Sequence, residues 1–392
     1  MMLTELAEII FWFSILAIAH TYLFYPAIII LLSIRKKNNS IIYNSITEMP
    51  EISIIMAVRN AEKVIEKKII SIFENTYDIN KIKFYIGSDA SDDNTDKIIL
   101  ELKNKYPGLL YTRFENRVGK VQIINALEQK ANSGILVFTD VHAFLDKRAI
   151  ENIVKHFFNP DIIVVCGCLK NLKPINKGIA HQENIFMKQE FKLKYAEGKL
   201  WGTTIGAYGA FYAIRKTSFS PVPVNFIVDD FYISLKAITK KGKAICEPSA
   251  IAYENVSASL KTEFKRKMRI SIGNFQNLRI LYHVLFSKKL TLSFAFFSHK
   301  ILRWVSPIFI FFSIISSATL FNKNLFHSIF FIIIMLSLIS TIIDYFSRKI
   351  EIHVIILRSI AHFYYMNLAL LLGMFKFMKG VNTNVWEPTN RE

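Results

Sequence analysis

The chain of 392 residues has few cysteines and few acidic residues for its length. Its three cysteines, Cys166, Cys168 and Cys246, are too few and too unevenly spaced for a zinc site, so we expect them to be small core residues. There are 31 acidic residues against 49 lysines and arginines, a net charge of +18. No aromatic-interleaved RNA-binding motif or basic recognition helix accompanies this excess, which argues against nucleic acid as a partner. Anionic lipid headgroups and a phosphate-bearing substrate explain the charge better.

Several long runs lack charged residues, and the first of them predicts a membrane helix. Residues 9–34 contain no Asp, Glu, Lys or Arg, and this length is enough to cross a hydrocarbon core. A cleaved signal peptide is the alternative, but Glu5 and Glu8 precede the run where a signal peptide has basic residues. A basic cluster, residues 35–37, follows the run, and positive flanks stay in the cytosol. We therefore expect the next region to be cytosolic.

Two further runs near the other end, residues 304–321 and 325–343, predict a hairpin of membrane helices. Residues 359–375 are a weaker candidate because charged or polar residues border or interrupt them, so this segment could lie in the interface or re-enter. The composition between these ends is that of a globular domain. The expected organisation is an N-terminal anchor (1–37), a globular domain (50–255), amphipathic interfacial helices (256–303), a C-terminal membrane region (304–378) and a tail (379–392).

Within the globular region, short strands alternate with helical stretches. Residues 52–58 and 82–89 read as strands that end in polar residues, with a helix expected over 61–74. This alternation predicts an α/β fold with a mostly parallel sheet and right-handed crossovers. Ligands bind such sheets at the carboxyl ends of the strands. We expect one cleft to gather the polar residues of three strand ends: Arg59 and Asn60, Asp89 to Asp93, and Asp140 with His142.

The loops lack both G-x-G-x-x-G and G-x-x-x-x-G-K-[ST], so the sequence supports neither a common dinucleotide fold nor a P-loop. Asp89 can accept hydrogen bonds from a base or ribose, and the turn at residues 117–120 offers cations to a diphosphate. Asp140 and His142 are two residues apart at a strand end and could share a divalent metal. Each feature has a simpler explanation, Asp140 as a helix N-cap and His142 as a solvated loop residue. Their order along one chain favours a shared site.

Seven motifs follow one another in the order of a known family. They are VRNAE (58–62), SDASDDNT (88–95), GKVQIINAL (119–127), FTDVHA (138–143), GAFYAIRK (209–216), VDDFYISLKA (228–237) and RKMRISIGNFQNL (266–278). This succession resembles glycosyltransferase family 2. More narrowly, it is similar to the membrane-embedded members of that family, such as the cellulose, hyaluronan and poly-N-acetylglucosamine synthases. The resemblance spans residues 50–280, and the flanking apolar runs match as well.

The resemblance implies a GT-A fold and inverting transfer of a sugar from a nucleotide sugar, with UDP as the expected nucleotide. The implied acceptor is a hydroxyl of a polysaccharide or of a lipid-linked molecule. Asp230 matches the catalytic base, and Asp140 with His142 would hold Mg²⁺ or Mn²⁺. The residues expected to bind the nucleotide sugar are Arg59, Asn60, Asp89, Lys120, Asp140, Arg266 and Arg269, and those expected on the acceptor side are Asp229, Gly209 and Gln276.

Two departures from the family pattern bear on the metal and on the processivity. His142 replaces the second Asp of the D-x-D element, and imidazole suits Mg²⁺ less well than a carboxylate does. Arg266 and Ile270 stand where strongly processive synthases have Gln and Trp in their Q-x-x-R-W motif. The metal and the processivity are therefore left open by the sequence.

The chemistry requires cations on one side of the sugar and a base on the other. A departing diphosphate gains negative charge, which Lys120, Arg269 and a metal would stabilise. Asp230 would take the proton of the acceptor hydroxyl, and nearby acids would raise its pKa to suit that task. We expect only one of Asp229 and Asp230 to face the site. The alternative is that both form an acidic cap on a surface helix at residues 231–240.

These inferences predict a multi-pass protein of the cell membrane with a cytosolic catalytic domain. Its expected partners are a nucleotide sugar, a saccharide or lipid-linked acceptor, and membrane lipids, and the sequence gives no oligomeric state. A single-transfer enzyme that forms a glycolipid is one alternative. A catalytically inactive sugar-nucleotide-binding subunit of a membrane complex is another.

Overall fold

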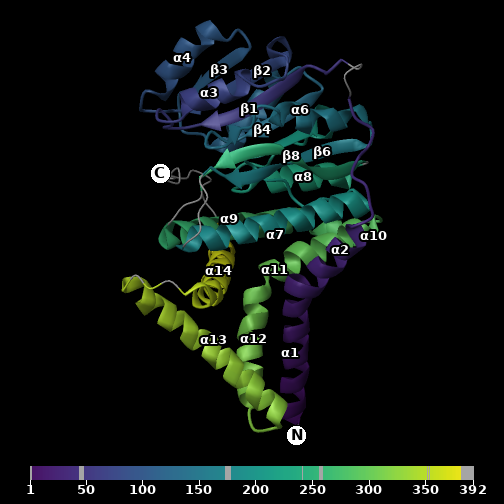
Figure 1. Cartoon of the computed structure of the whole chain (residues 1–392), viewed down its shortest axis with the longest axis vertical. Helices are drawn as coiled ribbons and strands as arrows, with labels where there is room; N and C mark the ends of the chain where they lie inside the picture. The colour runs from purple at the N-terminus through teal and green to yellow at the C-terminus, as the bar shows by residue number, and fades with distance from the viewer. Residues whose placement is uncertain are drawn as a thin grey trace.

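The computed structural model describes residues 2–43, 48–172, 178–240, 242–255, 259–350, 352 and 354–380. These residues form a lobe built on one sheet, from which long apolar helices extend (Figure 1). Nearly all of the tail that the sequence set apart, residues 381–392, lies outside the described residues.

Eight strands form a single sheet in the order β3-β2-β1-β4-β7-β6-β8-β5. In the parallel part, Ile52 of β1 is opposite Ile82 of β2 and Ile135 of β4. The strands are β1 (Ile52–Val58), β2 (Ile82–Asp89), β3 (Leu109–Phe114), β4 (Ile135–Thr139), β5 (Phe144–Leu145), β6 (Ile162–Asn171), β7 (Phe211–Arg215) and β8 (Lys243–Glu254).

The sheet is mixed, so the expected mostly parallel sheet is wrong for its second half. β1, β2, β3 and β4 pair in parallel, and β6 pairs in parallel with β8. β7 is antiparallel to both β4 and β6, and β5 is antiparallel to β8. The alternation of strands and helices predicts parallel pairing only up to β4. β7 enters between two strands that precede it in the chain, which no local pattern indicates.

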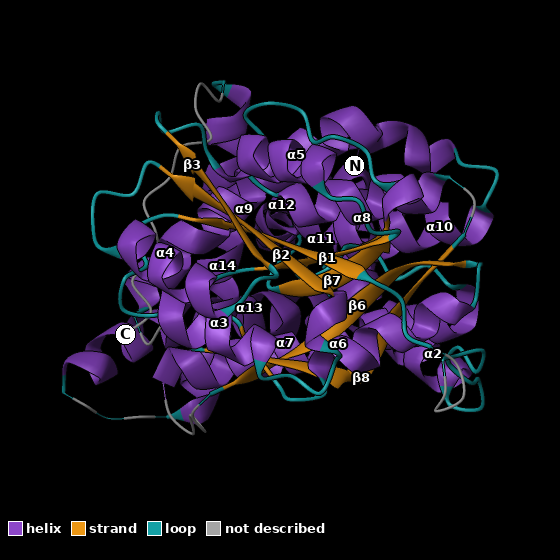
Figure 2. Ribbon diagram, turned by 90° about the horizontal axis from the view of Figure 1, so that it is seen from above, coloured by secondary structure: helices purple, strands orange, loops and turns teal. Residues whose placement is uncertain are grey.

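Two apolar cores cover the two faces of the sheet, because successive strand residues point to opposite sides. Ile54 and Met56 belong to one core, which α3 (Ile65–Phe73), α4 (Thr95–Lys105) and α6 (Ala149–Val154) complete. Ile55 belongs to the other, which includes residues of α5 (Lys120–Lys130), α7 (Gly178–Trp201) and α8 (Asp229–Thr239). Figure 2 shows the strands running between these helices. α3 begins four residues later than expected.

The helices beyond the sheet lie at its base and below it (Figure 1). α7 and α9 run across the base of the lobe, and α14 lies beneath α9. The remaining elements are α1 (Met2–Ala19), η1 (His20–Phe24), α2 (Tyr25–Ser33), η2 (Ile79–Lys81), η3 (Lys155–Phe158), η4 (Lys216–Ser218), α9 (Leu260–Leu281), η5 (Tyr282–Phe286), α10 (Leu290–Ala295), η6 (Phe296–Ile301), α11 (Leu302–Trp304), α12 (Ser306–Thr319), α13 (Leu325–Lys349) and α14 (Ile355–Met378).

In the described part of the chain, three helices are long and apolar enough to cross a membrane. They are Met2–Ser33, Leu325–Lys349 and Ile355–Met378. A fourth span results only if Leu290–Trp304 and Ser306–Thr319, which are bent by 60°, count as one. The helix expected over 304–321 is thus too short to qualify alone, since Pro307 lies at the start of α12 and the bend separates it from α11. The candidate that the sequence ranked as weaker, α14, qualifies.

Candidate active site

The carboxyl ends of β1, β2 and β4 meet at a small pocket, as the strand pattern predicted. This pocket, which we call the smaller pocket, has a volume of about 150 Å³. Seven of the expected site residues line it: Arg59, Asp89, Lys120, Asp140, His142, Asp229 and Arg269. Three helices therefore add side chains to the strand ends, α5 through Lys120, α8 through Asp229 and α9 through Arg269.

Asp89 fixes the turn that precedes α5. Its carboxylate accepts hydrogen bonds from the backbone N–H groups of Val118, at 2.7 Å, and Gly119, at 3.1 Å. Gly119 has a φ of 86°, a conformation that favours glycine. Because Asp89 Oδ1 already accepts two hydrogen bonds from the backbone, Asp89 stabilises the turn that carries Lys120 in this structure.

Arg59 and Asn60 order the loop after β2. Arg59 Nη1 donates to the backbone oxygens of Asp89 and Ala90, each at 2.8 Å. Asn60 lies outside the lining of the smaller pocket, and its side chain exchanges hydrogen bonds with Asp92, the shorter at 2.6 Å. Only Arg59 of this pair reaches the pocket.

Lys120 bridges two acidic residues of the site. Its Nζ lies 3.0 Å from Asp140 Oδ1 and 3.4 Å from Asp229 Oδ1. Burial alone lowers the pKa of Lys120, but the carboxylates of Asp140, Asp229 and Asp230 outweigh it and raise the pKa above its usual value. The ammonium therefore stays charged at neutral pH.

Asp229 and Asp230 form the first turn of α8, and both line a larger cavity of about 550 Å³. The expectation that only one of them faces the site is wrong. They begin a helix, where successive side chains are about 100° apart, instead of alternating as in a strand. Asp229 is buried rather than part of a surface cap, and it also lines the smaller pocket.

The surroundings of Asp230 suit a proton acceptor. Burial, followed by the neighbouring charge of Asp229, raises the pKa of Asp230 to about 6, against the opposing effect of Lys120. Gly209 lies against this carboxylate, since a Cβ added at Gly209 would be 2.9 Å from Asp230 Oδ2. The backbone N–H of Phe231 donates to Asp230 Oδ1 at 2.8 Å.

Asp140 and His142 are the residues that could hold a divalent cation. Both line the smaller pocket, and a carboxylate and an imidazole are accepted ligands of Mn²⁺ and Mg²⁺. Among the described residues, no group of three or more His, Cys, Asp or Glu side chains is placed to hold a metal. The pair fits a cation that takes its other ligands from phosphate oxygens and water, as Mg²⁺ commonly does.

The three expected residues of α9 differ in position. Arg269 lines both the smaller pocket and the larger cavity. Arg266 lines only the larger cavity, and its guanidinium pairs with Glu263, at 2.8 Å, and Glu183, at 2.9 Å. Gln276 lines neither, because its amide accepts from Ile227 N and donates to Asn225 O, which holds the loop before α8.

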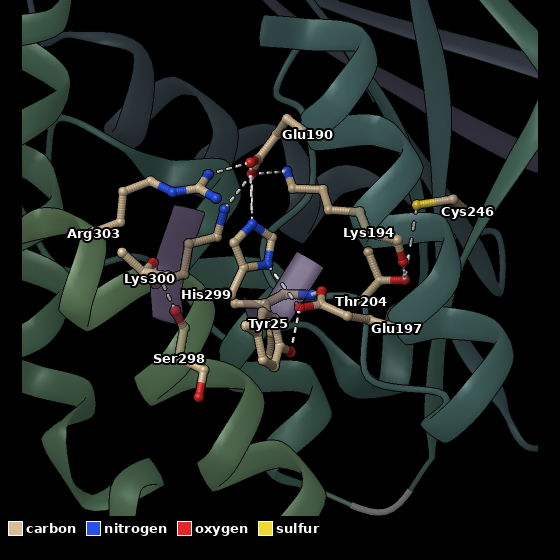
Figure 3. A network of polar contacts seen from close by, with 12 residues as sticks. Tyr25, Glu190, Lys194, Glu197, Thr204, Cys246, Ser298, His299, Lys300 and Arg303 are labelled. Carbon is tan, nitrogen blue, oxygen red and sulfur yellow. Dashed lines mark hydrogen bonds and ion pairs between the residues drawn. The ribbon is translucent and has the colours of Figure 1, made fainter. Parts of the chain in front are cut away.

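A buried network borders the larger cavity and was not predicted as a unit (Figure 3). Glu190 of α7 accepts from Lys300 and Arg303 and contacts His299 Nε2 at 3.1 Å. His299 Nδ1 lies 2.8 Å from Glu197, which also accepts from Tyr25. Glu190 carried no signal for this network, because His299, Lys300 and Arg303 are more than 100 residues away in the chain.

The larger cavity extends from the acidic pair to the apolar helices. Asp140, Asp229 and Asp230 line it. So do side chains from three apolar segments: Tyr22 of η1, Trp304 of α11, and Phe363, Met366 and Leu370 of α14. It shares five residues with the smaller pocket: Lys120, Asp140, Ile227, Asp229 and Arg269. The two spaces therefore adjoin at these five residues.

Comparison with known proteins agrees with this arrangement. Residues 53–221 match the family model described as glycosyl transferase family 2. The chain contains a glycosyltransferase family 2 domain. A probable glycosyltransferase of Bacillus subtilis (strain 168), YdaM, is 21% identical over 319 residues, which cover 78% of this chain and 74% of that protein.

The structural comparison shows which fold this chain shares with a solved protein. The mannosyltransferase PcManGT from Pyrobaculum calidifontis, solved in complex with GDP-Man and Mn²⁺, superimposes with a TM-score of 0.68 at 18% identity. The match covers 95% of this chain and 99% of PcManGT, so it includes the helices outside the sheet. The α/β, GT-A-like fold is thereby confirmed, whereas the narrower resemblance to membrane-embedded polysaccharide synthases stays a prediction.

Proposed function

We propose that this glycosyltransferase is an inverting enzyme of a membrane that transfers a sugar from a nucleotide sugar to an acceptor hydroxyl. The observation that carries the proposal is the junction of the two spaces. The smaller pocket supplies Lys120 and Arg269 for a diphosphate, and the larger cavity holds Asp230 beside that junction. A donor in the first space and an acceptor in the second would meet between cations and a base.

The donor's diphosphate would lie near Lys120 and Arg269, with Asp140 and His142 holding Mg²⁺ or Mn²⁺. When bound, such a cation stabilises the negative charge of the departing diphosphate. The resemblance of the sequence favours a UDP-linked sugar, whereas the structural neighbour was solved with GDP-Man. Both nucleotides therefore belong in a test of the donor.

Asp230 would act as the general base of an inverting displacement. Its carboxylate removes the proton of the acceptor hydroxyl while that oxygen attacks the anomeric carbon. The bond from that carbon to the diphosphate oxygen breaks at the same time, and the configuration inverts because attack and departure occur on opposite faces. Lys120 stays charged in this site, which suits it to the leaving group.

The lining of the larger cavity favours a lipid-linked acceptor. Trp304, Phe363 and Met366 would offer an apolar wall to the lipid part, while Asp230 meets the hydroxyl. A free sugar would leave these apolar side chains without a partner. This observation supports the second candidate function, a single-transfer enzyme that forms a glycolipid, beside the polymer-forming one.

Transfer assays with radiolabelled UDP- and GDP-sugars test the proposal directly. The purified full-length protein is incubated with membrane lipid extract, with Mn²⁺, Mg²⁺ or a chelator. We expect radiolabel to enter a lipid-extractable product, and its chain length separates one transfer from polymerisation. We expect chelation to abolish transfer.

The substitution Asp230→Asn tests the assigned base. Removal of a general base typically costs about 10²–10⁴-fold in rate, so transfer should fall by that factor. Asp161→Asn is the matched control, because the Asp161 side chain is 63% exposed and lies in the turn before β6. Unchanged transfer by an assembled membrane complex that contains the Asp230→Asn variant would favour the inactive-subunit alternative.

A further inference from the structure

A basic groove between α9 and α14 lies apart from the two spaces of the active site. We call it the lysine groove, and its volume is about 490 Å³. Its lining consists of Lys261, Phe264, Lys265 and Met268 from α9, Leu372, Phe375 and Lys376 from α14, and Lys379, the C-cap of α14. None of these residues lines the smaller pocket or the larger cavity.

Each helix contributes one continuous face to the lysine groove. On both helices the four lining residues follow the spacing i, i+3, i+4 and i+7, which places them on one side of a helix. The faces are held at a fixed separation because α9 and α14 touch at Gly373, where an added Cβ would lie 2.6 Å from the backbone oxygen of Met268. Ser271 Oγ also donates to Leu370 O, at 2.7 Å. The groove is therefore a built feature of the helix pair.

The charge of the lysine groove is uncompensated within the described part of the chain. Its four lysines are exposed, no acidic side chain lines it, and none of the four forms an ion pair with a described residue. Like charges three or four residues apart on a helix repel each other. Arg266 and Lys267, on the same helix, instead pair with Glu183 and Glu263. An anion from outside the described chain would relieve the repulsion.

The apolar side chains in the lysine groove indicate what kind of anion fits. Leu372 and Phe375 are 38% and 48% exposed, and Phe264 and Met268 complete an apolar strip beside the cations. A soluble phosphate would use only the lysines. An amphiphile would use both, with its phosphate at the ammonium groups and its chain along the strip. The lysines of α14 lie at the end of a helix long and apolar enough to cross a membrane.

We propose that the lysine groove binds the headgroup and upper acyl chain of an anionic phospholipid. The site fixes α9, which carries Arg269 into the active site, against the membrane surface. This inference rests on the membrane association in the proposed function and is independent of the donor, the acceptor and the chemistry. Its test therefore uses lipid binding and not sugar transfer.

Photo-crosslinking of lipids to the full-length protein tests the proposal. The protein is reconstituted in phosphatidylcholine nanodiscs that contain a phosphatidylglycerol probe with a diazirine in its acyl chain. A phosphatidylcholine probe with the same chain is the comparison. We expect crosslinks at residues 261–268 and 372–379, with the anionic probe favoured by about tenfold or more. Equal labelling by the two probes would overturn the proposal.

Two charge-matched variants separate the lysine groove from general attraction to a basic protein. The groove variant replaces Lys261, Lys265, Lys376 and Lys379 with Gln, and the control replaces the exposed Lys83, Lys97, Lys103 and Lys105. The preference for phosphatidylglycerol should disappear only in the groove variant, with both variants unfolding at similar temperatures. The double variant, with Gln at Lys376 and Lys379, should lose part of the preference for phosphatidylglycerol. It replaces the quadruple variant in the test if the quadruple variant misfolds. Equal loss in the control, or displacement of the probe by glycerol 3-phosphate, would refute a phospholipid site.

Discussion

Single residues decide the protonation state of the active site. Asp229 and Asp230 are neighbours at the start of α8, and Lys120 pairs with the first of them and with Asp140. A buried acid beside another acid binds its proton more tightly, whereas an ammonium group loosens it. The pKa of Asp230 is raised to about 6 because burial and Asp229 together outweigh Lys120.

The pH profile of sugar transfer should report this pKa. A general base works only when it is deprotonated, so kcat/KM should rise with pH through about 6 and level off above it. Below that pH, activity should fall tenfold per pH unit. Initial rates at constant ionic strength between pH 4.5 and 8.5 measure the rise. A profile that is flat across this range would contradict the assignment of Asp230 as the base.

The substitution Gly209→Ala should impair transfer without unfolding the protein. The new Cβ would lie 2.9 Å from Asp230 Oδ2, so the carboxylate must move by a few tenths of an ångström or more. Small misplacements of a catalytic group can cost up to about 10²-fold in rate. Steady-state kinetics measure the loss.

The control for this substitution is Gly134→Ala, since a Cβ at Gly134 meets no described atom within 4 Å. The control should keep the activity and the unfolding temperature of the natural protein. A full retention of activity in Gly209→Ala would mean that the contact with Asp230 does not constrain the base.

At the residue scale, the sequence indicated the polar strand ends but not the burial around them. Asp89, Asp140 and His142 could be grouped because each lies at or just after the end of a strand, and strand ends of one sheet converge. The expectation that only one of Asp229 and Asp230 faces the site was wrong, because α8 begins at Asp229 and both carboxylates lie in its first turn. That start depends on the loop held by Gln276, whose contacts cross about 50 residues of sequence.

Among the elements, α7 connects the sheet lobe to the segment that contains η6 and α11. Glu190 of α7 is the shared partner of three basic groups from η6 and α11, and it is buried. Burial raises the pKa of Glu190, but His299, Lys300 and Arg303 outweigh it and hold the pKa well below its usual value. The contribution of this carboxylate to stability is therefore present above its unfolded-state pKa and is lost as the pH falls through the folded one.

The substitution Glu190→Gln should loosen this connection. It leaves the buried Lys300 and the partly buried Arg303 without their carboxylate, and breaking such a buried pair typically costs about 3–5 kcal/mol. Thermal unfolding in detergent at pH 7 should show a marked drop in the midpoint. Glu101→Gln, at an exposed position of α4, should show none. Equal midpoints in the two variants would show that Glu190 is dispensable.

The apolar helices show where hydropathy alone misleads. Residues 304–321 read as a span, yet the bend at the start of α12 leaves a helix of 14 residues. Residues 359–375 read as doubtful because charged or polar residues border or interrupt them, yet Arg358 is buried against Asp344 of α13, at 2.9 Å. A charge that is paired inside a helix bundle does not prevent a helix from qualifying as a span. The pairing partner is invisible in a hydropathy pattern.

On the scale of the whole molecule, the order of the strands was the least predictable feature. The parallel β1–β2 and β1–β4 pairs followed from a repeated local pattern. The register of β7 against β4, with Val137 opposite Ala213, joins residues far apart in the chain. Only the assembled core, in which α7 and α8 cover the same face, selects that pairing.

The orientation of the chain in a membrane can be tested by cysteine labelling. The basic residues 35–37 predict that the sheet lobe faces the cytosol. In Figure 1, the turn between α12 and α13 lies at the end of the molecule farthest from that lobe. A membrane-impermeant maleimide should therefore label Asn322→Cys in intact cells, but Ser40→Cys only after permeabilisation. Both positions are exposed.

The labelling experiment starts from a Cys168→Ser background, because Cys166 and Cys246 are buried and only Cys168 is partly accessible. Without an added cysteine, this background should take up no label. The reverse pattern, with Ser40→Cys labelled from outside, would place the lobe on the other side of the membrane and separate it from a cytosolic donor.

The bridge formed by Lys120 has a consequence for the enzyme between turnovers. Two acids on different elements, Asp140 after β4 and Asp229 on α8, share one internal counter-ion. Departure of the product therefore does not leave two bare negative charges facing each other. The cleft can therefore keep the same arrangement of side chains until the next sugar nucleotide binds.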